Sequence, residues 1–203
     1  MSPRTVDKSA KKRALLRASM KVFARKGFAK AKMIDIANEA GIGKGTIYEY
    51  FRSKDQIFID AFHFFIGDLE AEYDKILSSP KGPIEKFEEI IDTTIDGFLA
   101  AGDFGGILMD FWAEGIRNHQ QIEMEHIFNL KEVYQKYREI IAEVIEDGIR
   151  IGKFREIDAK LSAAILIGCL DGLLLQSIMD PKMIDLRKAA RVCANIFISG
   201  LAR

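Results

Sequence analysis

The amino-acid sequence predicts an all-α protein, and three observations support this fold class. Hydrophobic residues make up 48% of the 203 residues, so the chain can bury a sizeable core as one or two domains. There are only four prolines, and β-branched residues form few runs. Apolar residues recur three and four positions apart along most of the chain, which is the period of helices buried on one side.

Charge is unevenly distributed along the chain, although the formal net charge is zero. Residues 1–55 contain 14 Lys and Arg against 5 Asp and Glu, a net charge of +9. Residues 56–203 contain 16 against 25, a net charge of −9. A basic end of this kind is typical of a protein that meets polyphosphate, and the acidic remainder does not share in that contact.

The cysteines and the apolar runs bear on the cellular location. Cys169 and Cys193 are too few for a disulfide scaffold and lack the spacing of a metal site, so we expect a reducing cytoplasm. The charged N-terminus has no apolar stretch typical of a signal peptide. The most apolar run, Leu161 to Leu175, is interrupted by Asp171 and is shorter than the ~20 residues that span a bilayer. We therefore predict a cytoplasmic protein without a membrane partner, in which this run forms a buried helix.

After a short arm, the first expected element is a helix over residues 8–26. Basic side chains fill the part of its surface that is not apolar, and we expect most of them to be solvated. Gly27 ends the helix, because a helix C-terminus favours a residue that tolerates φ > 0, and Phe28 folds back onto it. The apolar side consists of Leu15, Leu16, Ala18, Val22 and Phe23.

Residues 33–51, MIDIANEAGIGKGTIYEYF, indicate two short helices joined by a turn. Gly41 suits the C-terminus of the first helix, and Gly43 serves as the N-cap of the second. The second helix is anchored by Ile47 and Phe51, and its outer side is polar. A helix of this kind suits insertion into the major groove of DNA, which is wide enough to admit it.

The stretch from Ile36 to Asp55 reads I-A-x-x-A-G-I-x-K-G-T-I-Y-x-Y-F-x-S-K-D, and it resembles the DNA-binding signature of the TetR family of repressors. Glycines, aromatic residues and apolar positions all fall in register, over roughly the first quarter of the chain. The rest resembles the family in length and helical pattern. The resemblance implies a helix-turn-helix domain over residues 1–52 and an effector-binding and dimerisation domain over residues 53–203, with about nine helices in all.

The side-chain chemistry suggests which residues contact DNA. Lys44, Gly45 and Thr46 lie at the N-terminus of the recognition helix, the end that reaches base edges in this motif. Lysine donates to guanine, threonine bonds a base or touches a thymine methyl, and glycine permits close approach. Tyr48 and Tyr50 are expected phosphate contacts.

Lys54 is also an expected phosphate contact, because it lies at a helix N-terminus where free amides add to its own charge. The chain departs from the family pattern just before the first helix of the motif, with Ala31-Lys32 in place of the usual Thr-Thr. Losing a hydroxyl cap costs ~1 kcal/mol of local stability. We expect Lys32 to contact phosphate directly. The family often has Ser where Gly43 stands, so one side-chain contact is missing.

The remaining helices follow the same apolar period. Ser53 N-caps a helix over 54–77 that links the DNA-facing unit to the rest, and the loop Ser-Ser-Pro-Lys-Gly-Pro follows at 78–83. Gly152 ends a long helix, and together with Phe154 and Asp158 it resembles the turn that family members often have before their last two helices. The further helices are expected over 84–100, 107–117, 121–151, 159–179 and 184–202.

The resemblance also implies an apolar effector pocket in the second domain. Most large apolar side chains there must simply be core, but an aromatic-rich set suits an apolar or amphiphilic effector, such as a fatty acyl derivative or a hydrophobic drug. Asp171 and Gln176 would mark the polar end, although Asp171 could equally cap a helix or pair across a dimer. The expected effector-binding residues are Phe62, Phe65, Phe98, Phe104, Met109, Phe111, Trp112, Asp171 and Gln176.

The last two expected helices suit a dimer interface. The helix over 159–179 is too apolar all round for one face of a monomer, and its small residues at helical spacing allow another helix to approach closely. We predict that the pair forms half of a four-helix interface between two copies. The small residues are Ala163, Ala164, Gly168 and Gly172.

These patterns predict a homodimeric repressor that is released from a palindromic operator by a small effector, without a cofactor or catalytic site. A first alternative is an activator or a nucleoid-type DNA binder with the same head. A second is a helical-bundle metal carrier or enzyme that uses His119, Glu123 and His126, which a helix would present on one side. Surface polar residues often produce such spacings, so we expect no metal.

Overall fold

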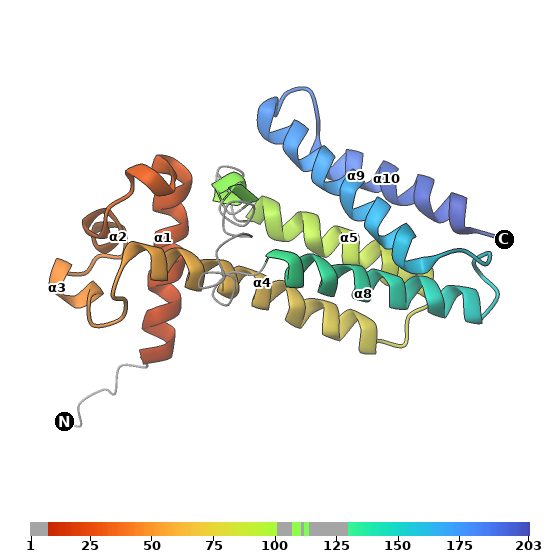
Figure 1. Cartoon of the computed structure of the whole chain (residues 1–203), viewed down its shortest axis with the longest axis horizontal. Coiled ribbons are helices and arrows are strands. Elements are labelled where there is room, and N and C mark those ends of the chain that lie inside the picture. The colour runs from red at the N-terminus through yellow and green to blue at the C-terminus, as the bar shows by residue number, and fades with distance from the viewer. Residues whose placement is uncertain (1–7, 101–106, 111, 114–129) are drawn as a thin grey trace. The chain divides into compact units, whose positions relative to one another are not determined.

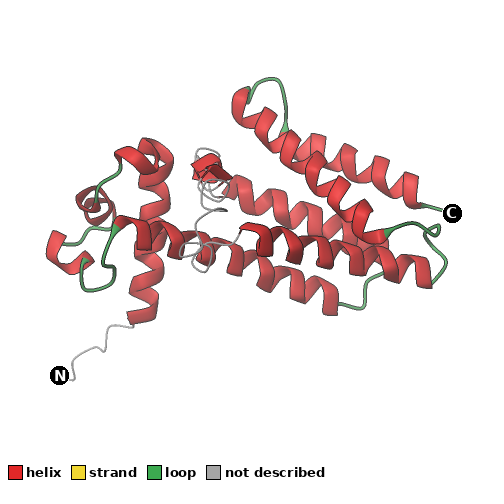
Figure 2. Ribbon diagram, in the orientation of Figure 1, coloured by secondary structure: helices red, strands yellow, loops and turns green. Residues whose placement is uncertain are grey.

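A computed structural model describes residues 8–100, 107–110, 112–113 and 130–203. Within these ranges the chain is all-α, as predicted, and the only β-type pairing is an isolated bridge between Phe154 and Ala202 (Figure 2). Residues 107–110 and 112–113 are helical as well. The helices labelled in Figure 1 are α1 (Lys8–Lys30), α2 (Met33–Glu39), α3 (Lys44–Ile47), α4 (Lys54–Ser78), α5 (Pro83–Ala100), α8 (Leu130–Arg150), α9 (Ala159–Met179) and α10 (Leu186–Leu201).

Contacts divide the described chain into two compact units. The first contains residues 8–68 with 107–110 and 112–113, and the second contains residues 69–100 and 130–203. The division falls inside α4, which is one continuous helix, so α4 contributes its first part to one core and its last part to the other. The sequence-based boundary between residues 52 and 53 stays a prediction.

The first unit has an aromatic core between α1 and α4. Phe23 and Phe58 are almost fully buried, and their ring centroids are 5.6 Å apart. The expected fold-back of Phe28 is confirmed, because its ring centroid lies 5.8 Å from that of Phe23 and 4.4 Å from that of Phe58. Gly27 interrupts α1 with φ 71° and ψ 157°. The predicted end of the first helix at Gly27 is therefore confirmed, and a further helical turn follows the break and runs to Lys30.

Side-chain caps and a proline fix several helix ends close to their expected positions. Ser53 Oγ accepts a hydrogen bond from the Gln56 amide (3.1 Å) at the start of α4, which confirms the predicted N-cap. Asp158 and Asp185 accept from amides in the first turns of α9 and α10 in the same way. Pro83 opens α5, where the missing N–H of proline has no partner to lose.

The second unit is a bundle of α5, α8, α9, α10 and the end of α4, with branched apolar side chains at its centre. Ile145 and Leu166 are fully buried, from α8 and α9 respectively. Arginines of α10 pair with aspartates of α5 at the surface, since Arg191 contacts both carboxylate oxygens of Asp92 at 3.2 and 3.3 Å. Figure 1 shows α9 and α10 side by side.

Helix α9 has one apolar side that is exposed in the single chain. Its 21 residues are long and apolar enough, by length and composition, to cross a membrane, and 28% of its most apolar stretch is buried. The predicted helix over 159–179 is confirmed, but the expectation that the run Leu161 to Leu175 is buried is wrong for the single chain. One side packs on the bundle through residues such as Ala163 and Leu166, while Leu161 and Ile165 are more than half exposed.

Gly148 permits a close approach between α8 and the loop that follows it. A Cβ placed on Gly148 would lie 2.0 Å from the ring of Phe154, which is 1% exposed. Phe154 cannot move outward without leaving the core, so only glycine fits at this position.

We predict that Gly148→Ala lowers the free energy of unfolding by about 1–3 kcal/mol, because the added methyl group overpacks the site. The matched control is Gly67→Ala in α4, where an added Cβ meets nothing within 4 Å. That change should raise stability by about 0.5–1 kcal/mol, since alanine is the better helix former. Urea denaturation at one protein concentration measures both. Equal effects of the two variants would contradict the packing argument.

Candidate nucleic-acid interface

The turn between α2 and α3 is set by one glycine and two buried residues. Ile36 and Ala37 are fully buried and anchor α2. Gly41 adopts φ 67°, the left-handed conformation that glycine reaches at little cost and that the sequence predicted. The chain then reverses, and the Ile42 amide donates to the Ala37 carbonyl at 2.9 Å. This local geometry presents α3 at a fixed angle to α2.

Helix α3 is shorter than the sequence indicated. It covers Lys44–Ile47, after an extended Gly43 at φ −68° and ψ 149°. The amides of Tyr48, Glu49 and Tyr50 then donate to carbonyls three residues earlier, so the helix tightens into turns before Phe51. Both predicted anchors are buried, with Ile47 at 0% and Phe51 at 1% exposure.

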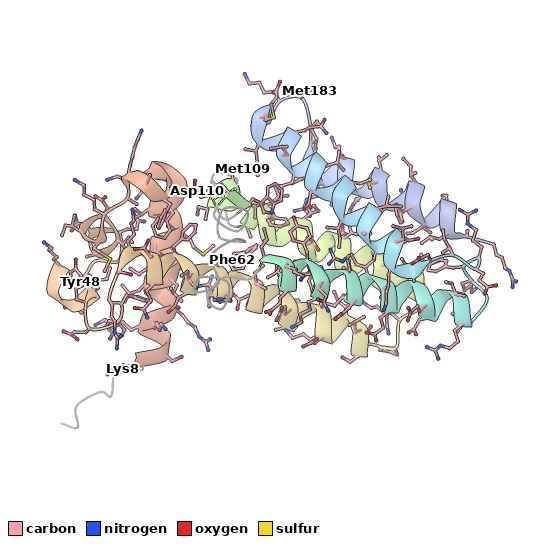
Figure 3. All side chains as sticks on the ribbon, viewed as in Figure 1. Lys8, Tyr48, Phe62, Met109, Asp110 and Met183 are labelled. Carbon is pink, nitrogen blue, oxygen red and sulfur yellow. The ribbon has the colours of Figure 1, made fainter. Side chains whose placement is uncertain are left out.

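The outer side of α3 carries the residues that we assigned to DNA. Lys44 and Gly45 are exposed, and Thr46 is half-buried. A Cβ placed on Gly45 meets nothing within 4 Å, so this residue leaves open space for another molecule. Tyr48 is 50% exposed (Figure 3), and Tyr50 is half-buried with Lys11 Nζ 6.0 Å from its ring centroid.

The start of α2 is better capped than we expected. The Asp35 carboxylate, in the first turn, accepts a hydrogen bond from the Lys32 amide at 3.0 Å, which is one half of a capping box. Lys26 pairs with the same carboxylate at 2.8 Å and lowers the pKa of Asp35. The Asp35 side chain, at the third helical position, thus partly replaces the missing hydroxyl cap. The sequence analysis did not anticipate this contact.

Ion pairs neutralise part of the positive charge of the first unit. Lys12 pairs with Asp60 at 2.8 Å, and Lys26 with Asp35, so these charges are held within the first unit. Arg17 and Arg25 pair with Asp68 and Glu39. In the described chain, Lys32 and Lys44 are exposed and form no ion pair, so their positive charge is available around α2 and α3.

Lys54 has partners inside the first unit. Its Nζ donates to the Phe28 carbonyl at 2.7 Å and lies 4.3 Å from the Phe28 ring centroid. The Ala29 carbonyl is 3.4 Å away. Lys54 therefore caps the last turn of α1, a role that the sequence did not indicate. The phosphate contact that we expected of it stays a prediction.

The Phe28 amide has a partner of its own, since it donates to Asp110 Oδ2 at 2.9 Å. Asp110 comes from the helical residues 107–110, whose bond to α1 was not expected from the sequence (Figure 3). Both main-chain groups of Phe28 are thus held by side chains that are distant in sequence.

The expected effector-binding residues are divided between the two units. Phe62 and Phe65 are buried, at 2% and 8% exposure. The first unit holds Phe62, Phe65, Met109 and Trp112. The second holds Phe98, Asp171 and Gln176. Phe104 and Phe111 lie outside the described residues, and so do the candidate metal ligands His119, Glu123 and His126.

Asp171 is half-buried and bonded within its own chain. The Tyr134 hydroxyl donates to its Oδ2 at 2.8 Å. Burial raises the pKa of Asp171, and the Tyr134 hydrogen bond acts in the opposite direction. Gln176 is exposed, and its side chain donates to the Gly172 carbonyl at 3.2 Å. Of the two polar candidates in α9, only Asp171 reaches the interior of the bundle.

Sequence reasoning did not single out the tyrosines of the second unit, of which Tyr134 bonds Asp171. The Tyr73 hydroxyl bonds Thr94 Oγ1 at 2.7 Å, and burial raises the pKa of Tyr73 to about 12. Tyr137 packs edge-on against Tyr73, with ring centroids 5.7 Å apart. A tyrosine rather than a phenylalanine at a core position was the available signal.

Two surface grooves lie elsewhere. One, of about 350 Å³, is lined by α1 and α4 residues that include Lys12, Arg13 and His63. The other, of about 300 Å³, lies between α5 and α10 beside the Arg191–Asp92 pair. Neither groove is lined by a residue that we assigned to an effector.

Comparison with known proteins supplies the decisive observation. Residues 15–61 match the model for bacterial regulatory proteins of the tetR family, and residues 83–200 match the BetI-type transcriptional repressor C-terminal model. The chain belongs to the tetR family. The resemblance seen in the sequence is confirmed, and this family member is a DNA-binding transcriptional regulator. Its family is one of regulators rather than enzymes.

Individual relatives extend the match over nearly the whole chain. The fatty acid metabolism regulator protein of Bacillus subtilis is 24% identical over 196 residues, which is 96% of this chain and 97% of the relative. A regulator from Saccharomonospora viridis, solved in complex with choline, has a TM-score of 0.82 at 20% identity and covers 97% of this chain and 100% of its own. Bacillus subtilis FadR in complex with stearoyl-CoA has a TM-score of 0.72 at 22% identity, covering 93% and 98%. At these identities the two structures establish the tetR-family fold.

We predict that Lys54→Met lowers the free energy of unfolding by about 1 kcal/mol, because the charged hydrogen bond to the Phe28 carbonyl is lost at a half-exposed site. The slope of log affinity against log salt for DNA should also fall by about one if the third N–H of Lys54 reaches a phosphate. The control is Lys30→Met, an exposed lysine at the end of α1.

Unfolding curves and salt-dependent fluorescence anisotropy measure the two effects separately. Unchanged stability would contradict the capping role. A loss of stability with an unchanged salt slope would remove Lys54 from the DNA contacts.

Proposed function

We propose that this tetR-family regulator is a homodimeric repressor that leaves a palindromic operator when a small molecule binds its helical body. The observation that carries the proposal is the outer side of α3, where Lys44 and Gly45 are exposed above the buried anchor Ile47. A polar helix surface on apolar anchors suits the major groove, and the protein acts in the cytoplasm where that DNA lies.

Different residues of α2, α3 and their flanking turns contact the bases and the phosphates. Lys44, Gly45 and Thr46 meet base edges, because the N-terminal end of the recognition helix enters the groove first. Exposed Lys32, together with Tyr48 and Tyr50, contacts phosphate. Two copies related by a two-fold axis read half-sites about one helical turn, ~34–36 Å, apart.

The dimer forms through α9 and α10. Ile165 of α9 is 53% exposed, and Ile196 of α10 is 67% exposed. Neighbouring exposed side chains on the same helices include Leu161, Leu175, Met179 and Val192. Two adjacent apolar stripes suit burial against the same stripes of a second copy, as in a four-helix interface. The packed side of α9 and the carboxylate of Asp171 at its centre argue against a lipid-facing helix.

The effector acts through α4. This helix is continuous from Lys54 to Ser78 and belongs to both units, so a change in the second unit reaches the head through it. Effector binding weakens operator binding only if the effector prefers the DNA-incompetent state. The relatives solved with choline and with stearoyl-CoA support a small-molecule effector of some kind.

We predict that the protein retards DNA from upstream of its own gene in a mobility-shift assay, and that two lysine variants separate the roles of the contacts. Lys44→Ala should lose ~1–3 kcal/mol of discrimination between operator and mutated operator, as expected for a base contact. Lys32→Ala should weaken all DNA to a similar degree and reduce the salt slope by about one.

The absence of sequence-dependent retardation at moderate salt would refute the operator proposal. An identical sequence dependence for both variants would refute the division of roles. Footprints that overlap the promoter distinguish a repressor from an activator.

We predict that Ile165→Glu and Ile196→Glu each convert the dimer into a monomer, because a charge on the stripe would be buried without a partner. Operator affinity should fall about tenfold or more, since two linked heads bind more tightly than one. Ile151→Glu is the matched control, because Ile151 is 56% exposed but lies outside α9 and α10. Analytical ultracentrifugation measures the mass, and unchanged dimers in both stripe variants would exclude this interface.

A further inference from the structure

The two cysteines of the chain lie on neighbouring helices of the second unit. Cys169 is on α9 and is exposed, and Cys193 is on α10 and is half-buried. Cys169 lies ten residues before the end of α9 at Met179, and Cys193 lies seven residues after the start of α10 at Leu186. At ~1.5 Å of rise per residue, the cysteines stand ~15 Å and ~10 Å along their helices from the connecting loop. Since α9 and α10 pack side by side, this places the two residues at similar heights (Figure 1).

The two side chains interact directly. The Cys193 thiol lies within hydrogen-bonding reach of the Cys169 side chain. Burial raises the pKa of the Cys193 thiol, and the charge and the hydrogen bond of Cys169 raise it further. A hydrogen bond that favours the protonated form of a group has that group as its donor, so Cys193 donates to the sulfur of Cys169. The exposed cysteine is thus the acceptor, and the half-buried cysteine is the donor.

The surroundings leave Cys169 open to a small molecule in the single chain. A Cβ placed on Gly168 or on Gly172 meets nothing within 4 Å, so neither neighbour on α9 fills the space beside the thiol. Ile165, one turn earlier, is 53% exposed, and Val192, next to Cys193, is 56% exposed.

A metal site does not suit this pair. No group of three His, Cys, Asp or Glu side chains that could hold a metal ion occurs in the described ranges. Structural zinc sites need four ligands and catalytic zinc sites three, so two thiols alone fall short. The chemistry left to two adjacent thiols is the formation of a disulfide.

We propose that Cys169 and Cys193 form a dithiol site that a peroxide oxidises to a disulfide between α9 and α10 of the same chain. This inference goes beyond the proposed function and does not need it. Redox-sensing cysteines are solvent-accessible and stand next to a resolving cysteine, which describes Cys169 and Cys193 respectively. Disulfides of cytoplasmic proteins are usually transient and redox-sensing rather than structural.

The reaction takes two steps. The Cys169 thiolate attacks one oxygen of hydrogen peroxide, the O–O bond breaks, and the other oxygen takes up a proton and leaves as water. Cys169 is now a sulfenic acid. The Cys193 sulfur then attacks the Cys169 sulfur, the S–O bond breaks, and a second water leaves. Two thiols and one hydrogen peroxide therefore give one disulfide and two waters, and an added dithiol reverses the change.

The site also meets the apolar stripes of the proposed dimer. Cys169 follows Ile165 by one turn of α9, and Cys193 precedes Ile196 by three residues of α10. A second copy seated on these stripes would cover Cys169, which is exposed in the single chain. Peroxide should therefore oxidise the monomer faster than the dimer.

The first experiment treats the reduced full-length protein with hydrogen peroxide and maps the non-reduced peptides by mass spectrometry. We expect a loss of two hydrogen atoms, a Cys169–Cys193 link within one chain, and full reversal by dithiothreitol. The same treatment of Ile165→Glu, the variant expected to be monomeric, should form the link faster. The new carboxylate would itself disfavour the Cys169 thiolate, so a faster reaction reports that the site has been uncovered.

Three products would overturn the proposal. These are no Cys169–Cys193 link in either protein, a link between two chains as the main product, and a sulfinic acid on Cys169 of the wild-type chain in place of the link.

Serine variants test the roles of the two thiols. Cys193→Ser removes the resolving thiol, so peroxide should leave a sulfenic acid on Cys169 that dimedone traps. In Cys169→Ser the half-buried Cys193 should react about tenfold more slowly, because its thiol stays protonated. Melting temperatures of the reduced variants equal to that of the wild type control for folding. Equal or faster reaction of Cys193, or no trapped sulfenic acid on Cys169, would overturn the assignment.

Failure of this inference and failure of the proposed function are separable. Retardation of operator DNA by the reduced protein tests the repressor without peroxide. If the link forms and Ile165→Glu is still dimeric by ultracentrifugation, the dithiol site stands and the proposed interface falls. If Ile165→Glu is monomeric and no link forms in it, the dithiol site falls and the interface stands.

Discussion

The main chain of Phe28 joins three parts of the first unit. Its amide donates to Asp110 at 2.9 Å, its carbonyl accepts from Lys54 at 2.7 Å, and its ring packs on Phe58. Backbone groups at a helix end lack partners within the helix, so these side chains satisfy groups that would otherwise need water. The end of α1 is therefore fixed against the start of α4. Helix α2 packs on α1, and α3 packs on α2, so both take their position from α1.

Some positive charges of the first unit are paired with acidic residues, and others are left exposed. Ion pairs such as Lys12–Asp60 and Lys26–Asp35 hold lysines against neighbouring helices. Exposed pairs of this kind contribute only ~0–1 kcal/mol each to stability. Their main effect is to neutralise the paired lysines, so that these positions add little positive charge to the surface. Lys32 and Lys44 stay exposed beside α2 and α3. A chain of zero net charge can in this way present a local positive surface to DNA.

Local signals allowed much of the fold to be predicted. Ser53, Asp158 and Gly41 act within a few residues, so helix ends could be placed from the sequence alone. The bonds of Phe28 could not be predicted, because Lys54 and Asp110 lie 26 and 82 residues away in the chain. The sequence predicted that a second copy covers α9, but composition does not reveal which of its side chains stay exposed in the single chain.

The tyrosines of the body show a second limit of sequence patterns. A tyrosine at a core position counts as apolar in a helical period, yet its hydroxyl requires a partner that phenylalanine does not. Tyr73 and Tyr134 find theirs in Thr94 and Asp171, whereas Tyr137 has none in the described chain. An unmet hydrogen bond raises the free energy of the effector-free body.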